Sequence, residues 1–310
     1  MDICKDIEEL APDAFLLNFT NPAGVITEAV LKHTNVKTIG LCNLPIGTKM
    51  QIADWYDVSV DRVDIEMVGI NHLNWTTKIV VNEVDVTKDV LSQVNNSGLQ
   101  VNNIPDFGWD ASFLEALGAL PCAYHRYYYM QDEMLRDQLD KLDTEGTRAD
   151  QVKGVEALLF EKYKDLNLKE KPKELEKRGG AYYSEAAIQL ICSIYNNKKD
   201  THIVNVRNNG IIKELPDDVS VEVNCLVDSE GAHPIQIQSE LSPQMKGLLQ
   251  VVKAFEEITV ETAINGDYEL AIQALTIHPL VGDIEAAKKI VDDILVQNEE
   301  YLPQFRRKRG

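Results

Sequence analysis

The sequence lacks the features that mark nucleic-acid-binding, membrane-spanning and disulfide-rich proteins. Its 310 residues carry a net charge of −19, which argues against nucleic-acid binding because a protein needs a basic surface to neutralise phosphates. No segment approaches the roughly 18 uninterrupted apolar residues of a membrane span. The five cysteines are odd in number and widely scattered, so we expect no disulfide framework and a reducing cytoplasm. The remaining composition, 44% hydrophobic and 26% charged, is that of an ordinary globular protein.

A glycine-rich dinucleotide-binding turn is also missing. The 17 glycines nowhere form the pattern Gly-x-Gly-x-x-Gly, in which a strand passes into a helix around a cofactor pyrophosphate. The sequence therefore offers no recognisable turn for the phosphates of a nicotinamide cofactor.

Two strand–helix units open the chain. Residues 14–19 and 36–41 are apolar runs typical of buried strands. Asn21 followed by Pro22 predicts a helix with Asn21 as its N-cap, and the second strand is also followed by a proline that begins a helix. This order predicts a parallel α/β sheet, whose ligands bind beyond the carboxyl ends of the strands. Asn21 and Cys42 would lie at that edge.

The pattern becomes mixed after about residue 60. Residues 65–70 and 75–81 are strand candidates, and residues 220–227 alternate between apolar and polar side chains. Long helices are expected between these strands, and one of them has an apolar stripe formed by Ile188, Ile191, Cys192 and Tyr195. This second region predicts a mixed α+β domain.

Two candidate metal ligands each follow an apolar strand. Cys42 begins a Cys-Asn-Leu-Pro turn after residues 38–41, and His72 follows residues 68–71. A thiolate and an imidazole at such positions suit one divalent metal held over an active site. Alone the pair is weak evidence, because a free cysteine is usually a small buried hydrophobe and a lone histidine is usually satisfied by hydrogen bonds.

Five spaced motifs strengthen the metal-site interpretation. They are residues 17–24 (LNFTNPAG), 40–47 (GLCNLPIG), 69–72 (GINH), 120–128 (LPCAYHRYY) and 146–149 (GTRA). In this order the chain resembles glycoside hydrolase family 4, and most closely its 6-phospho-beta-glucosidases. The resemblance extends from the first residues to residue 305.

This resemblance implies a fold and a division into domains. Family members begin with a dinucleotide-binding half that carries the glycine-rich turn, so we expect this chain to lack the amino-terminal part of that half. We expect an α/β fold in which residues 1–60 are the remaining part of a Rossmann-like NAD-binding domain with a parallel sheet. Residues 61–310 would form a larger mixed α+β domain that binds substrate and metal, similar to the C-terminal half of lactate and malate dehydrogenases. The missing cofactor turn is expected to impair activity.

The resemblance also implies an unusual route to hydrolysis. Family members oxidise C3 of the sugar with NAD, after which a base removes the C2 hydrogen, the C1 substituent leaves, water adds and hydride returns. By position, Cys42 and His72 would bind a divalent metal, usually Mn²⁺, that chelates the C2 and C3 oxygens. Tyr124 matches the family's base. A phenol with a reference pKa of about 10 needs the charge of the nearby metal to favour its phenolate.

Three polar residues are implied to bind the substrate. Thr147 and Asp150 predict a capping box that places Arg148 in the first turn of a helix, and Arg148 matches the family's phosphate-binding arginine. Asn21 matches a substrate-binding asparagine. Asn43 stands where the phospho-alpha-glucosidases have an aspartate that serves as an acid. The asparagine favours beta-linked substrates and leaves the general acid unidentified.

Three functions are compatible with these residues. The first is NAD- and Mn²⁺-dependent hydrolysis of 6-phospho-beta-glucosides, either phosphorylated disaccharides or aryl compounds. It would take place in the cytoplasm, in a homo-oligomer that binds neither nucleic acid nor membrane. The second is an inactive fragment that binds a sugar phosphate or a metal. The third is a 6-phospho-alpha-glucosidase.

Overall fold

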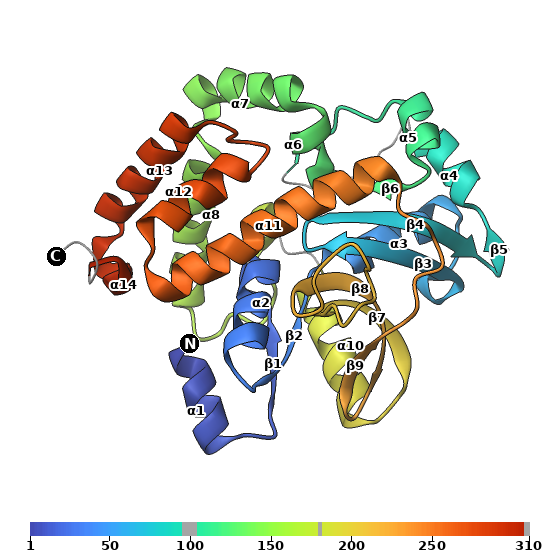
Figure 1. Ribbon diagram of the computed structural model, residues 1–310. Helices are drawn as coiled ribbons and strands as arrows, with labels where there is room; N and C mark the ends of the chain where they lie inside the picture. Colours follow the sequence, from blue (N-terminus) through green and yellow to red (C-terminus); the bar gives the residue numbers. More distant parts are fainter. Residues whose placement is uncertain (95–103, 179–181, 307–310) are drawn as a thin grey trace.

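A mixed nine-stranded sheet organises the computed structural model, which describes residues 1–94, 104–178 and 182–306 (Figure 1). Seven strands follow the order β1-β2-β7-β8-β3-β4-β5, while β6 pairs with β4 and β9 pairs with β8. The strands are β1 (Phe15–Asn18), β2 (Lys37–Gly40), β3 (Val63–Ile70), β4 (Leu73–Val81), β5 (Val84–Asp85), β6 (Leu120–Pro121), β7 (Asp200–Arg207), β8 (Ser220–Asp228) and β9 (Gly231–Pro234). The helices are α1 (Asp2–Leu10), α2 (Ala23–His33), α3 (Leu44–Trp55), α4 (Thr87–Gln93), α5 (Ala111–Leu117), α6 (Arg126–Tyr129), α7 (Gln131–Glu145), α8 (Arg148–Tyr163), α9 (Leu175–Arg178), α10 (Tyr183–Tyr195), α11 (Pro243–Asn265), α12 (Tyr268–Ile277), α13 (Ile284–Gln297) and α14 (Pro303–Arg306).

The first two strands are parallel, as the sequence predicted, with residues 15–18 opposite residues 37–40. The prediction of Asn21 as a helix N-cap is wrong. The Asn21–Pro22 peptide bond is cis, Pro22 occupies the cap position, and α2 begins at Ala23. Asn21 therefore lies outside the helix, and its exposed side chain takes no part in capping.

The remaining strands pair in antiparallel fashion and continue the same sheet. Gly40 at the end of β2 pairs with Asn205 of β7, which joins the parallel start to the mixed part. The strands predicted at residues 65–70, 75–81 and 220–227 are confirmed as β3, β4 and β8, and so is the α/β class with a parallel start and a larger mixed part. The division into two domains near residue 60 stays a prediction.

The first half of strand β8 is buried on both faces although its sequence alternates. Val221, Val223 and the intervening Glu222 all have 0% exposure. Helices α2 and α10 both contact β8, and α11 contacts α2 and β3; Figure 1 shows α11 crossing in front of the sheet. Alternation alone would leave the polar face in water. The helices instead place the first polar side chains of the strand, Ser220 and Glu222, in the interior.

Helix α10 buries a different face from the predicted one. Leu190 has 0% exposure and Ser193 is buried, whereas Ile188 and Ile191 are 59% and 46% exposed and Cys192 is half-buried. The predicted stripe is therefore wrong. Apolar residues occupy both sides of this helix, so its periodicity allowed two buried faces, and contact with β8 selects between them.

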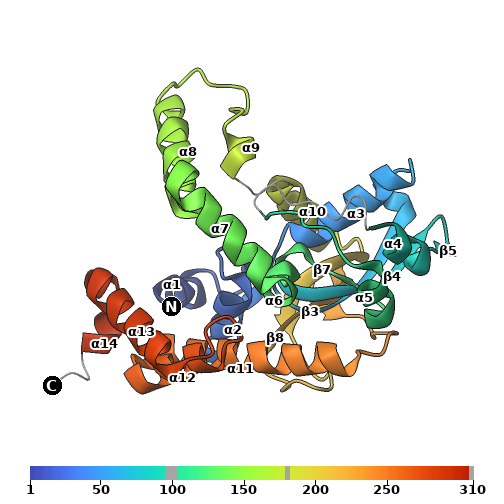
Figure 2. The same ribbon diagram turned by 90° about the horizontal axis from the view of Figure 1, so that it is seen from above.

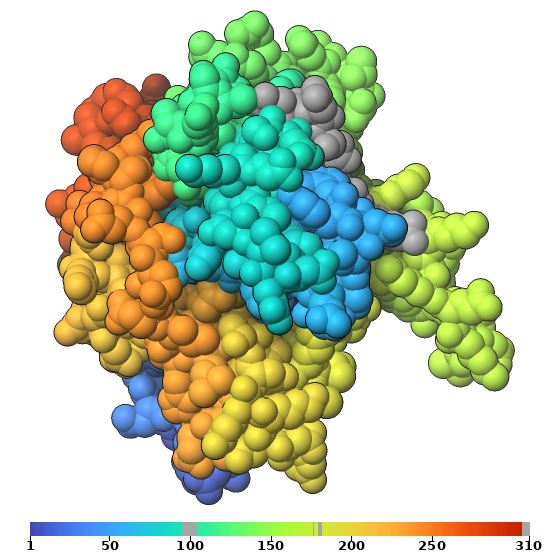
Figure 3. All heavy atoms as spheres, turned by 90° about the vertical axis from the view of Figure 1, so that its right-hand side faces the viewer, coloured from blue at the N-terminus to red at the C-terminus, as the bar shows by residue number. Residues whose placement is uncertain are grey.

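Helices α7 to α9 form an arm, residues 131–178, that projects from the body of the molecule (Figure 2). Its end is the yellow-green projection at the right of Figure 3. The predicted capping box is confirmed: Thr147 and Asp150 exchange hydrogen bonds at the start of α8. Leu158 and Phe160 on α8 are 57% and 63% exposed. Over the ranges that the structure covers, no helix is both long and apolar enough to cross a membrane.

Candidate active site

Five residues form a transverse row across five strands of the sheet. Gly40 of β2 pairs with Asn205 of β7, and Asn205 pairs with Glu222 of β8. Glu222 pairs with Gly69 of β3, and Gly69 pairs with Asn74 of β4. Paired residues on neighbouring strands point to the same face of a sheet, so the three polar side chains of the transverse row lie together.

The ends of the transverse row lead to Cys42 and His72. Strand β2 ends at Gly40, two residues before Cys42, and the turn between β3 and β4 consists of Asn71 and His72. The Asn71 side chain hydrogen-bonds with the Cys42 thiol, so the residue beside His72 contacts Cys42. The structure thus brings the two predicted metal ligands into one neighbourhood, although 29 residues separate them in the sequence.

Burial sets the protonation of both candidate ligands. It lowers the pKa of the His72 imidazole to about 4, so the ring is neutral near pH 7, which is the form that binds metals. Burial, assisted by the charge of Glu222, raises the pKa of the Cys42 thiol well above its usual range. The backbone N–H of Leu44 donates to Cys42 Sγ at 3.5 Å. A divalent cation would favour the thiolate, because a coordinating thiol loses its proton.

A thiol and a neutral imidazole fit a borderline-soft divalent metal. No group of three or more His, Cys, Asp or Glu side chains suited to a metal occurs within the described ranges. Two protein ligands leave further coordination positions to substrate and water, as a catalytic metal requires.

The chain fits NAD less well, because it has no Gly-x-Gly-x-x-Gly turn, and we assign no residue to that cofactor.

Tyr124 lies directly against His72. Their rings stack with centroids 4.2 Å apart and planes inclined by 20°. The segment before Tyr124 is docked onto β4, with Pro121 paired to Trp75, and Cys122 Sγ lies 3.3 Å from the His72 carbonyl oxygen. A base acting beside a metal needs this kind of proximity. The role of Tyr124 as a base stays a prediction.

Two of the predicted substrate-binding residues lie close to Cys42. Asn43 is half-buried, and its Oδ1 is 4.0 Å from Cys42 Sγ. Asn21 hydrogen-bonds with Tyr183 at the start of α10. Burial raises the pKa of Tyr183, and the nearby Cys42 adds to the effect. Tyr183 is a residue that the sequence did not single out, because its helix showed only an apolar pattern.

The third predicted substrate-binding residue, Arg148, lies on the arm. It is exposed in the first turn of α8, and its guanidinium donates to the Lys177 carbonyl oxygen at 3.1 Å and to Gln151 Oε1 at 3.5 Å. These partners belong to the arm itself. The contacts therefore do not join Arg148 to the neighbourhood of Cys42, and its role in binding phosphate stays a prediction.

Glu222 is the main residue of this region that the sequence did not reveal. Its Oε1 accepts hydrogen bonds from Asn71 Nδ2 at 3.3 Å and from Asn205 Nδ2 at 2.9 Å, and its Oε2 accepts one from Asn74 Nδ2. Burial raises the pKa of Glu222 to about 6, while the amide donors act in the opposite direction. Its position on the polar side of an alternating strand was the only signal in the sequence. That signal also suits a residue in water.

Comparison with known proteins identifies the class of this chain. A family model described as family 4 glycosyl hydrolase matches residues 1–58, and one described as the family 4 glycosyl hydrolase C-terminal domain matches residues 67–281. These matches place the chain among the enzymes that hydrolyse glycosidic bonds. It is 48% identical over 308 residues to a probable 6-phospho-beta-glucosidase of Bacillus subtilis, which covers 98% of this chain and 70% of that protein. The chain belongs to glycosyl hydrolase family 4.

Two similar solved structures have different substrate specificities. The 6-phospho-beta-glucosidase of Thermotoga maritima with manganese, NAD⁺ and glucose-6-phosphate has a TM-score of 0.84 and 36% identity, covering 96% of this chain and 69% of that one. A 6-phospho-alpha-glucosidase from gut microorganisms with NAD and glucose-6-phosphate has a TM-score of 0.85 and 26% identity, covering 98% and 71%. Since both resemble this chain equally in fold, the fold alone does not select the anomer.

Proposed function

We propose that this chain carries the metal-binding, substrate-binding and proton-transfer residues of an NAD- and manganese-dependent 6-phospho-beta-glucosidase. The observation that supports this most is the stacking of Tyr124 on His72 in the neighbourhood of Cys42. The family membership and the names of the similar proteins point in the same direction. The substrates would be phosphorylated disaccharides or aryl 6-phospho-beta-glucosides.

Each site residue has a definite part in this proposal. Cys42 and His72 hold the metal, which when bound polarises the sugar oxygens at C2 and C3. Tyr124 removes the proton from C2, and its position against His72 keeps the phenol near the metal's charge, which favours the phenolate. Asn21 and Asn43 orient the sugar ring by hydrogen bonds.

Arg148 binds the 6-phosphate in this proposal. A guanidinium forms strong charge-assisted hydrogen bonds with phosphate oxygens, and the global charge of −19 makes a local cation necessary. Its position in the first turn of α8 also adds the positive end of a helix dipole to the same anion.

The oxidation at C3 depends on NAD. Because the sequence has no Gly-x-Gly-x-x-Gly turn, we expect weak NAD binding and low turnover from these 310 residues. Low turnover would also agree with a second candidate function, in which the protein binds metal and sugar phosphate without catalysing hydrolysis.

The beta specificity rests on Asn43. An asparagine beside the metal ligand cannot donate a proton to the leaving group as a carboxylic acid does. The alternative is 6-phospho-alpha-glucosidase specificity, which the similar gut-microbial structure supports. Parallel assays of p-nitrophenyl 6-phospho-beta-glucoside and its alpha anomer, with NAD and Mn²⁺, distinguish the two. A clear preference for the alpha anomer would refute the beta assignment.

Proton exchange tests the proposal without depending on the NAD site. With Mn²⁺ in deuterated water, the chain should exchange the C2 hydrogen of 3-keto-glucose 6-phosphate, because the keto group already makes that hydrogen acidic. Nuclear magnetic resonance measures the loss of the C2 proton signal. Binding without exchange would favour the non-catalytic candidate, and exchange that ignores removal of the metal would refute the metal's role.

The cellular setting and assembly complete the proposal. We place the reaction in the cytoplasm, because phosphorylated sugars carry a charge that retains them inside cells, and all five cysteines are free thiols. We expect a homo-oligomer, since Ile188 and Ile191 on α10 are exposed apolar side chains. Light scattering gives the mass in solution, and a strictly monomeric mass would refute the homo-oligomer.

A further inference from the structure

Glu222 and Asn205 lie on the two strands between those that lead to the predicted metal ligands. In the strand order β2-β7-β8-β3, the strands that lead to Cys42 and His72 are separated by two others. Asn205 lies on one of these strands and Glu222 on the other, and both side chains have 0% exposure. The separation of Cys42 from His72 therefore depends on how these two side chains meet.

A single carboxylate holds both ends of the turn that carries His72. Glu222 accepts from Asn71 through Oε1 and from Asn74 through Oε2, and these two asparagines flank His72. His72 has a φ of 64°, a left-handed conformation that a non-glycine residue seldom adopts. Such a conformation persists when its surroundings over-determine it. The two hydrogen bonds to Glu222 do this from either side.

The same carboxylate is linked to the strand that leads to Cys42. Asn205 Nδ2 donates to Glu222 Oε1 at 2.9 Å and lies 3.5 Å from the carbonyl oxygen of Gly40. A Cβ atom on Gly40 would lie 2.8 Å from the Cβ of Asn205, closer than real side chains approach. Glycine at this position therefore permits the contact between β2 and Asn205, two residues before Cys42.

We propose that Glu222 is a positioning residue that sets the separation of Cys42 and His72 and thereby the affinity of the site for a divalent metal. This inference rests on the proposed function, in which Cys42 and His72 are the metal ligands. Supporting groups that orient ligands typically change metal affinity by about 10–100-fold. The negative charge of the carboxylate adds a long-range attraction for the cation.

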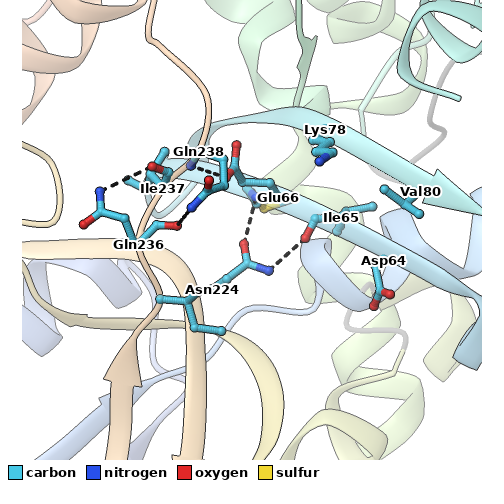
Figure 4. A pocket seen from close by; sticks show the side chains of 11 residues that line it. Asp64, Ile65, Glu66, Lys78, Val80, Asn224, Gln236, Ile237 and Gln238 are labelled. Carbon is cyan, nitrogen blue, oxygen red and sulfur yellow. Dashed lines mark hydrogen bonds between the residues drawn. The ribbon is translucent and has the colours of Figure 1, made fainter. Parts of the chain in front are cut away.

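Glu66 provides a matched control on the same sheet. Its carboxylate also accepts from three groups: Thr77 Oγ1 at 2.8 Å and the backbone N–H groups of Gln238 at 2.6 Å and Ser239 at 3.2 Å. Glu66 lines a cavity of about 240 Å³ whose walls include none of the proposed ligands (Figure 4). Its hydrogen bonds hold the segment after β9 rather than the turn with His72.

Metal titration of the full chain tests the inference. Free Mn²⁺ is followed by electron paramagnetic resonance, and Co²⁺ serves as a second probe whose thiolate charge-transfer absorption reports coordination by Cys42. Glu222→Gln should lower the affinity for Mn²⁺ by about 10–100-fold and change the cobalt absorption. Glu66→Gln should leave both unchanged.

A second substitution tests whether the hydrogen bonds of Glu222, rather than the stability of the whole protein, set the metal affinity. In Glu222→Gln, an amide oxygen can still accept from Asn71 and Asn205, but the NH₂ group that replaces Oε2 can no longer accept from Asn74 Nδ2. Adding Asn74→Asp restores a complementary pair, because the Gln amide donates to the new carboxylate. We expect the double variant to regain most of the lost affinity and the cobalt spectrum.

Several outcomes would overturn the inference. Wild-type affinity and spectrum in Glu222→Gln would do so, and so would equal losses in Glu222→Gln and Glu66→Gln with an unchanged spectrum, which would indicate a role in stability alone. If Glu222→Gln does not fold by circular dichroism, Asn74→Ala replaces it and must still weaken Mn²⁺ binding. No Mn²⁺ binding by the wild-type chain, or unaltered binding by Cys42→Ser, would instead refute the proposed function and this inference with it.

Discussion

The transverse row that leads to Cys42 and His72 and the arm that carries Arg148 are built in opposite ways. In the transverse row, the polar side chains are fully buried and bonded to one another across strands. On the arm, Arg148 is exposed and bonded to residues of the arm. Metal binding and proton transfer need geometry accurate to a fraction of an ångström, whereas attraction between a cation and a phosphate tolerates more variation. In the proposed function, the demanding part falls to the sheet.

The largest effect that would sharpen this comparison is expected from Tyr124→Phe. Removing the base should slow exchange of the C2 hydrogen of 3-keto-glucose 6-phosphate by about 10²–10⁴-fold, while binding of glucose 6-phosphate measured by calorimetry stays unchanged. Tyr127→Phe is the control, because that half-buried phenol packs against the same apolar cluster as Tyr124. Exchange at the wild-type rate in Tyr124→Phe would remove Tyr124 as the base.

A smaller effect on a different quantity is expected from Arg148→Ala. Loss of charge-assisted hydrogen bonds should weaken binding of glucose 6-phosphate relative to glucose by about 10–100-fold, with the exchange rate at saturating ligand unchanged. Arg136→Ala is matched to it, because Arg136 is also an exposed arginine of the arm. A drop in the saturated exchange rate would break the comparison, since it would show that the arm shapes the proton-transfer site.

Two glycine substitutions compare the packing of the regions directly. Gly40→Ala should lower the free energy of unfolding by about 1–3 kcal/mol, because the new Cβ has no room against Asn205 and Thr27. Gly154→Ala on α8 should raise it by about 0.5–1 kcal/mol, because beyond its chain neighbours and the helix's own backbone the new Cβ meets nothing within 4 Å, and alanine favours a helix. Urea denaturation measures both. Equal responses would contradict the contrast between a packed sheet and an open arm.

A further effect is expected in the pH dependence of stability around His125. Burial lowers the pKa of His125 to about 3, so between about pH 6.5 and 3 the unfolded chain binds more protons and stability falls as the pH falls. His125→Phe should remove about 1.4 kcal/mol per pH unit of this slope below pH 6.5. Glu222 acts oppositely, because its pKa is raised to about 6 and its protonation favours the folded state. Denaturation of the wild-type chain and of His125→Phe between pH 7.5 and 5.5 measures how the free energy of unfolding of each depends on pH. Identical slopes would refute the expected contribution of His125.

Strands with strong patterns were predictable from the sequence, and so was the capping box of Thr147 and Asp150. The motifs also indicated that Cys42 and His72 belong to one neighbourhood. The buried side of α10 and the interior position of Glu222 were not predictable, because each depends on which element covers a surface rather than on local periodicity. Asn21 failed as a cap for a local reason, since Pro22 itself takes the cap position.

The transverse row also ties the folding of the sheet to its ligand. Its hydrogen bonds connect residues 165, 17 and 148 positions apart in the chain, and closing such long loops costs entropy and slows folding. A metal held as proposed meets its ligands only after all these pairings exist, so at a concentration 100 times its Kd it would stabilise the native state by about 2.7 kcal/mol. Amide protons of β2, β7, β8 and β3 would then exchange with solvent more slowly as one cooperative unit, while those of the arm would keep their own rates.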